Sequence, residues 1–218
     1  MGFLLILLIF GGCTAALWFH GFWSNVLTLV NLIFAGLLAT NYFEPLAAIV
    51  SDQVPDKSFY LDFVVFWLLF CLSFGILRAI SDGIGKEWFK FSMPFEMAGR
   101  SVFALWNGWL ITCIVCMSLH LAPIPANALG LFDSPTGSMF MGLAPDRMWL
   151  AFVQSRSRGA LSRSNHSGLS HPDDDATREV FDPRGEFAIR YHQRRLDADD
   201  GSGGGGGAVE NTETEDGG

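Results

Sequence analysis

The sequence predicts an all-α membrane protein, in which a bundle of four transmembrane helices is followed by a largely disordered polar C-terminal tail. Residues 2–43 contain no Asp, Glu, Lys or Arg, and two further long apolar runs follow before residue 125. Beyond that point the chain becomes polar and carries 15 of its 22 acidic residues. An ordinary soluble domain is excluded, because too little polar chain surrounds the apolar segments to cover them.

The uncharged segment 2–43 is long enough for two membrane crossings, since one crossing needs about 20 apolar residues. A reversal at His20-Gly21 divides it, because the histidine is polar and glycine permits a sharp turn. We therefore expect the first span at about residues 2–19 and the second at about residues 22–43.

A cleaved signal peptide is the alternative for the first span. Such a peptide carries a basic region before its apolar core and a polar cleavage region after it. Here Met1-Gly2 leads directly into Phe3, and apolar sequence resumes at Phe22. We therefore expect the first span to be a helix of the mature protein.

The third span is expected at about residues 60–80, where Asp62 and Arg78 can extend their charged groups to the lipid headgroups. The fourth is expected at about residues 101–122, just before two prolines. Residues 1–125 thus form the predicted transmembrane domain. Aromatic residues lie near the ends of the spans, as is typical of membrane helices: Trp18, Trp23, Tyr42, Tyr60 and Trp88.

Residues 126–196 are expected to form an extramembrane segment that contains one short amphipathic helix at about 146–158. Such a helix packs against the end of the bundle, which is the interpretation we favour, or lies in the membrane interface. Residues 197–218 contain five consecutive glycines among acidic residues, so a disordered tail is predicted. The apolar face of the amphipathic helix consists of Met148, Trp149, Phe152 and Val153.

A candidate metal or redox site lies in the fourth span, where Cys113, Cys116 and His120 follow the spacing i, i+3 and i+7 and share one helix face. A metal site needs a fourth ligand, and the only other thiols or imidazoles in the spans are distant in sequence. Small, polarizable cysteines also pack well between membrane helices. We favour packing, and we expect neither a metal nor another cofactor.

Two asparagines, Asn31 and Asn107, lie well inside apolar spans. An amide that faces lipid is costly, so both are expected to face the bundle interior and to form hydrogen bonds across helices. Holding helices together is the favoured role, and lining a path for a solute is the alternative. No acidic or basic residue lies near the middle of a predicted span, which disfavours a proton relay or an ion-coupled carrier.

Small residues recur at spacings of three and four along two of the spans, which lets helix backbones approach closely. On the fourth span these are Ser101, Ala104, Gly108 and Thr112, and on the second they are Thr28, Ala35 and Ala39. Helix packing is therefore the expected role of both rows.

Signatures of soluble enzymes are missing from the sequence, including the nucleophile elbow, the phosphate-binding loop, the zinc-protease motif and the dinucleotide fingerprint. The arginines of the tail are mixed with a surplus of acids, so nucleic acid is not an expected partner. We expect a protein that is not an enzyme. The alternative is an intramembrane enzyme in which Cys113, Cys116 and His120 converge on a metal or a water-filled pocket.

Four short-looped spans, a Gly21-Phe22 elbow and a fourth helix rich in small residues resemble the bacterial colicin V production protein (CvpA) family over about residues 1–122. In the family a basic pair precedes the elbow, whereas Phe19-His20 stands here. Ala104 and Gly108 keep the four-residue spacing of the family's fourth helix, and Asn107 replaces its basic residue.

The resemblance implies a multi-pass protein of the bacterial inner membrane with a part in toxin (colicin V) production or export and in envelope maintenance. A small oligomeric channel or transporter subunit is the alternative. The expected partners are the lipid bilayer and either further copies of the chain or other envelope proteins.

The basic residues of the short connections predict the orientation, because they favour the cytoplasmic side. The connection 81–100 contains three of them and Arg78 lies at its edge, whereas the connection 44–59 contains one. We therefore expect the connection 81–100 in the cytoplasm and both termini outside it.

Overall fold

The computed structural model describes residues 2–51, 58–84, 92–122, 124, 142–157, 181–182 and 185–201. The protein is all-helical, as predicted from the sequence. The helices are α1 (Gly2–Trp18), α2 (Phe22–Ser51), α3 (Ser58–Ile84), α4 (Met93–Leu121), α5 (Pro145–Ser157) and α7 (Phe187–Gly201).

Three of these helices, α2, α3 and α4, are long and apolar enough to cross a membrane. The shorter helix α1 has 17 residues and no charged side chain, and at 1.5 Å per residue it extends about 25 Å, close to the ~30 Å apolar core of a bilayer. The first predicted crossing therefore corresponds to the shortest of the four apolar helices.

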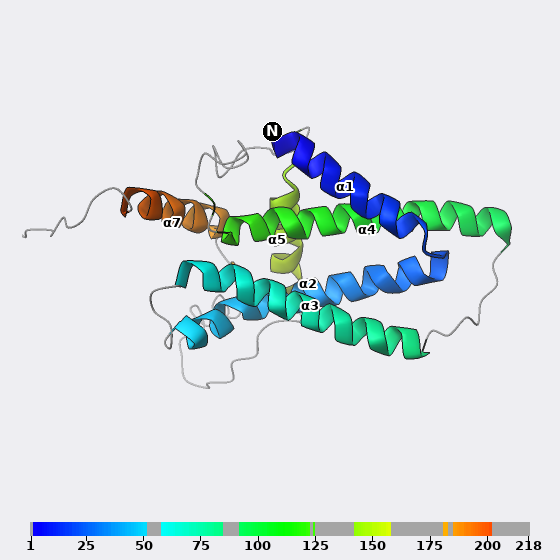
Figure 1. The fold of residues 1–218 in the computed structure, drawn as a ribbon, viewed down its shortest axis with the longest axis horizontal. Helices are drawn as coiled ribbons and strands as arrows, with labels where there is room; N and C mark the ends of the chain where they lie inside the picture. Colours follow the sequence, from blue (N-terminus) through cyan, green and yellow to red (C-terminus); the bar gives the residue numbers. More distant parts are fainter. Residues whose placement is uncertain are drawn as a thin grey trace, which may run out of the picture.

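The four apolar helices lie side by side along one axis (Figure 1). Helices α2 and α3 form an antiparallel pair, and α4 packs against both α1 and α2. Helix α5 runs across this axis and packs mainly on α4. Helix α7 lies at the end of the bundle where α2 ends and α3 begins (Figure 1).

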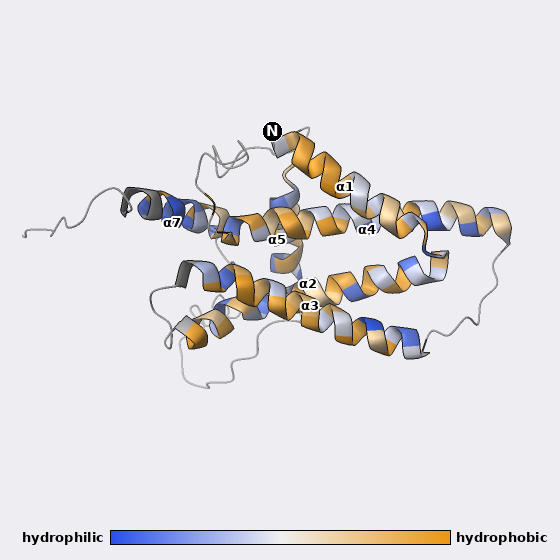
Figure 2. Ribbon diagram, viewed as in Figure 1, coloured by the Kyte–Doolittle hydropathy of each residue, from blue (hydrophilic) through white to orange (hydrophobic). Residues whose placement is uncertain are grey.

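The outer surface of the bundle is apolar. Leu8 on α1 is 72% exposed and Leu68 on α3 is 60% exposed. Figure 2 shows apolar residues along α1 to α4, whereas α7 is mostly hydrophilic. Exposed apolar surface of this extent fits contact with lipid. A helix suits that environment, because its backbone polar groups form hydrogen bonds within the helix.

Helices α2, α3 and α4 are all longer than their predicted spans. Helix α2 continues from residue 43 through Pro45 to Ser51, into the segment expected to be a connection. Just before the proline, Phe43 packs edge-on against Phe66 of α3 with ring centroids 6.0 Å apart, and one turn later Ala47 is 3% exposed. Packing on both sides of the proline therefore outweighs its tendency to end a helix.

The C-terminal helices are part of the core and are not separate from the bundle. Trp149 of α5 is 1% exposed, and Phe187 of α7 packs against Phe43 of α2 and is fully buried. Because Phe187 and Tyr191 hold α7 in place, the helix covers 197–201, the first residues of the segment expected to be disordered. The remaining residues of that segment, 202–218, lie outside the described residues.

Candidate functional site

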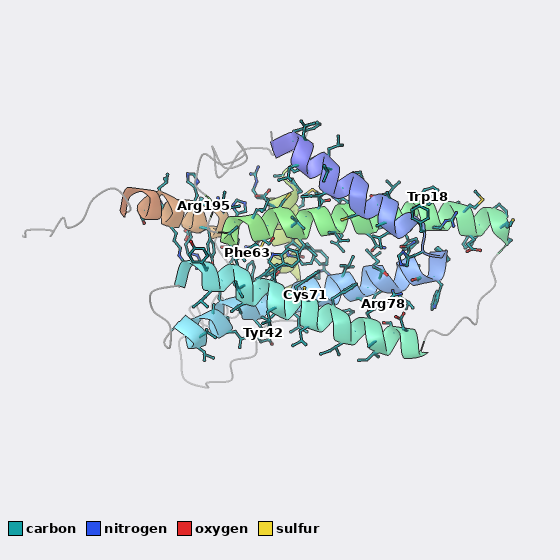
Figure 3. The ribbon with its side chains drawn as sticks, in the orientation of Figure 1. Trp18, Tyr42, Phe63, Cys71, Arg78 and Arg195 are labelled. Carbon is teal, nitrogen blue, oxygen red and sulfur yellow. The ribbon has the colours of Figure 1, made fainter. Side chains whose placement is uncertain are left out.

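A polar contact joins α2 and α3, and we call it the polar seam. It consists of Ser24, Thr28 and Asn31 of α2 and Arg78, Ser81 and Asp82 of α3. The guanidinium group of Arg78 donates hydrogen bonds to Thr28 Oγ1 at 2.9 Å and to Ser24 Oγ at 3.1 Å. Its Nε donates to Asp82 Oδ2 at 3.0 Å. Figure 3 shows Arg78 on the side of α3 that faces α2.

The register between the two helices places the guanidinium group of Arg78 toward the start of α2. Ser81 Oγ donates to Asn31 Oδ1 at 3.0 Å, so Ser81 lies opposite a residue about 13 Å from the start of α2. The uncharged stretch of α2 extends from residue 22 to 43, and Asn31 is near its middle. The guanidinium group of Arg78 contacts Thr28 and Ser24, about 9 and 3 Å from the start of α2, so it lies between the middle of the span and its end.

The guanidinium group reaches along α2 toward Ser24, two residues after the first residue of this helix, and toward Asp82, which is 56% exposed near the end of α3. This is the direction that the predicted extension of Arg78 to the headgroups requires, and that extension stays a prediction. A charged group between apolar helices is costly unless it is paired, and here Asp82 and two hydroxyl groups supply the partners. Charged residues in membrane helices usually mark functional positions.

A second polar contact joins α1, α2 and α4. Asn107 Nδ2 of α4 donates to the backbone oxygen of Asn25 on α2 at 2.9 Å. Asn25 Nδ2 in turn donates to the backbone oxygens of Leu17 and His20, at 3.1 and 3.2 Å, where α1 ends. Both asparagines are fully buried. Sequence reasoning missed Asn25. The available signal was that Asn25, like Asn31, is an amide in the uncharged stretch 2–43.

Three buried amide atoms of these contacts have no hydrogen-bond partner in the described part of the chain: Asn25 Oδ1, Asn31 Nδ2 and Asn107 Oδ1. Each of the three asparagines uses its other amide atom in a hydrogen bond to a neighbouring residue. A buried amide atom without a partner costs free energy. These three atoms are therefore available to form hydrogen bonds with water or a polar solute.

The predicted small residues allow close helix packing. Ala104 is fully buried, and a Cβ atom on Gly108 would meet the Thr14 side chain and lie 3.2 Å from the Thr14 nitrogen of α1. Gly21 is exposed, and a Cβ there would meet only Glu96 Oε1, at 3.8 Å. Gly36, which sequence reasoning missed, faces Trp149, whose Cζ2 would be 2.6 Å from a Cβ.

The cysteine and histidine candidates lie under α5. Cys113 and Cys116 are buried, and His120 Nε2 lies 3.0 Å from Asp146 Oδ2 at the start of α5. Both side chains of the His120–Asp146 pair are 2% exposed. Within the described ranges, no group of three or more His, Cys, Asp or Glu residues could hold a metal ion. Asp146 lies 26 residues from His120 in sequence, so local spacing does not predict the pair.

Helix α7 is attached to the opposite end of the bundle from the polar seam by charged contacts. Arg190 pairs with Glu44 of α2, and Arg194 pairs with Asp62 of α3. Tyr191 donates to Asp62 Oδ2 at 3.3 Å, and burial raises the pKa of its hydroxyl. These groups line a cleft of about 290 Å³.

Comparison with known proteins gives one family. Residues 4–145 match the family model described as colicin V production protein. The matched region includes α2, α3, α4 and nearly all of α1, and it ends at the first residue of α5. Neither the curated proteins nor the solved structures contain a match.

Proposed function

The chain belongs to the colicin V production protein family, and from this we propose that it takes part in the production or export of a colicin V-type toxin and in envelope maintenance. It does so as a non-enzymatic scaffold of the bacterial inner membrane. The family match, which covers well over half of the chain, is the observation that carries the proposal.

The hydrogen bonding of the bundle supports the scaffold role. Asn31 and Asn107 are both buried, and each bonds to a residue of another helix. Arg78 ties α3 to α2 in the same way. A protein whose buried polar groups join its own helices has the rigidity that a scaffold needs.

Toxin secretion tests the proposal. We expect this chain to restore toxin activity in the medium when it is expressed in a colicin V-producing strain that lacks its own family member. Activity is measured separately in the medium and in lysed cells, with the empty vector as the control. Equal toxin secretion from the strain that expresses this chain and from the strain with the empty vector would contradict a role in production or export. Crosslinking and mass spectrometry of the detergent-purified protein then distinguish further copies of the chain from other envelope proteins as partners.

A channel or transporter subunit is the second candidate, and the polar seam favours it. The guanidinium group of Arg78 lies between α2 and α3, and among the described residues the Nδ2 donor of Asn31 has no hydrogen-bond partner. Such groups can bind an anion or line a water-filled path.

Reconstitution separates the two candidates. If the protein is a scaffold, a chloride-sensitive dye trapped in liposomes that contain it should respond to added chloride as it does in empty liposomes. Chloride flux that Arg78→Gln abolishes, at an unchanged melting temperature, would favour the channel.

We also propose that both termini lie outside the cytoplasm. The connection between α3 and α4 carries Lys86 and Lys90, and Arg100 follows on α4, whereas the connection between α2 and α3 carries only Lys57. Arg78 near the end of α3 adds to this difference, which favours a cytoplasmic α3–α4 connection. Alkaline phosphatase fused after residue 125 should be active, and a fluorescent reporter that folds only in the cytoplasm should be dark there. The reverse result would place the C-terminal segment in the cytoplasm.

A further inference from the structure

An apolar groove of about 440 Å³ runs along the outer side of α1 where this helix meets α4. Its lining includes Phe10, Gly11, Ala15, Trp18, Phe19 and Leu105. Gly11 and Ala15 leave the space open, because a Cβ on Gly11 would have no atom within 4 Å. From Phe10 to Trp18 the helix rises about 12 Å, which is close to the ~15 Å of one bilayer leaflet.

A positive charge lies at one end of this groove. The guanidinium carbon of Arg100 on α4 is 5.6 Å from the centre of the Trp18 ring, and Figure 3 shows Trp18 where the end of α1 meets α4. Arg78, Arg190 and Arg194 each pair with a carboxylate, whereas in the described part of the chain Arg100 has no ion pair. Its Nε is a buried donor without a hydrogen-bond partner there.

We propose that the groove and Arg100 together form a binding site for an anionic phospholipid. The groove takes one acyl chain, and the phosphate accepts hydrogen bonds from the guanidinium group, whose planar fork suits two phosphate oxygens. Trp18 positions the guanidinium group through a cation–π contact at the end of an apolar helix, which is the depth of the headgroups. This inference is independent of the role in toxin production.

Native mass spectrometry of the full-length protein, released from nanodiscs of equal parts phosphatidylglycerol and phosphatidylcholine, tests the site. The wild-type protein should retain phosphatidylglycerol preferentially. Arg100→Gln should lower that preference by about tenfold or more, because a charge-assisted hydrogen bond is lost. Arg100→Lys, which keeps the charge, should retain part of the preference. Gly11→Leu should displace both lipids by filling the groove.

Two matched variants serve as controls. Arg156 of α5 also stacks on an aromatic ring, that of Phe152 at 5.8 Å, but it borders no part of the groove, so Arg156→Gln should leave lipid retention unchanged. Gly12 has equally open surroundings on α1 and does not line the groove, so Gly12→Leu should also have no effect. Equal retention of both lipids by the wild type would overturn the proposal, as would an unchanged preference in Arg100→Gln. If the wild type is instead a dimer that retains no lipid, and Gly11→Leu dissociates this dimer, the proposal is also overturned. The groove is then assigned to a second copy of the chain.

Discussion

Replacing Gly108 by leucine is expected to lower both the melting temperature in detergent and the amount of protein in the membrane. A Cβ atom at this position of α4 would lie 3.2 Å from the backbone nitrogen of Thr14 and 3.3 Å from the backbone oxygen of Phe10. Backbone atoms cannot move aside as a flexible side chain can, so α1 must shift away from α4. Overpacking of this kind costs about 1–3 kcal/mol or more.

Gly12→Leu is the control for this prediction. It adds the same side chain to the neighbouring helix α1, where a Cβ has no atom within 4 Å, so stability should be unchanged. Thermal unfolding in detergent and quantitative immunoblotting of membranes measure the two effects. If Gly108→Leu accumulates and unfolds as the wild type does, α1 and α4 do not pack as described.

Replacing Asp146 by alanine is expected to weaken the packing of α5 on the bundle. The carboxylate contacts His120 Nε2 at 3.0 Å, and both side chains are 2% exposed. Its loss deprives a buried nitrogen of this hydrogen bond, which costs about 1–3 kcal/mol. The thiols of Cys113 and Cys116, now buried, should then react with a maleimide.

The labelling is measured in a chain in which Cys13 and Cys71 are serine, since Cys71 is exposed and would react in any case. Arg190→Gln is the matched control, because it removes an ion pair with Glu44 whose side chains are 60% and 31% exposed. An exposed pair contributes about 0–1 kcal/mol, so labelling should not change. Equal labelling of Asp146→Ala and the wild type would show that the pair does not hold α5.

The helices themselves follow from local properties of the sequence. The uncharged stretch 2–43 is stable in a membrane as helix, because a helix pairs its backbone polar groups within the segment, and the turn at His20-Gly21 divides it into α1 and α2. The four-residue spacing of Ala104 and Gly108 depends only on the period of one helix, and so does the apolar pattern of α5. These features could therefore be predicted without knowledge of any neighbour.

The partners of the buried polar groups depend on how distant segments are placed against one another, and no local period contains this information. Asn31 lies opposite Ser81 because of the register between α2 and α3, and that register brings Arg78 to Thr28 and Ser24. Sequence alone placed Arg78 at the end of an apolar run, but it does not show which residues of α2 lie opposite that end.

The positions of α5 and α7 were likewise decided only by tertiary packing. Trp149 donates to Thr40 Oγ1 at 3.0 Å and occupies the space left by Gly36, two residues more than 100 positions earlier in the chain. Phe187 packs on Phe43 at a similar separation in sequence. An amphipathic face shows that a helix will bury one side, but the surface that covers it is set by the shape of the assembled bundle.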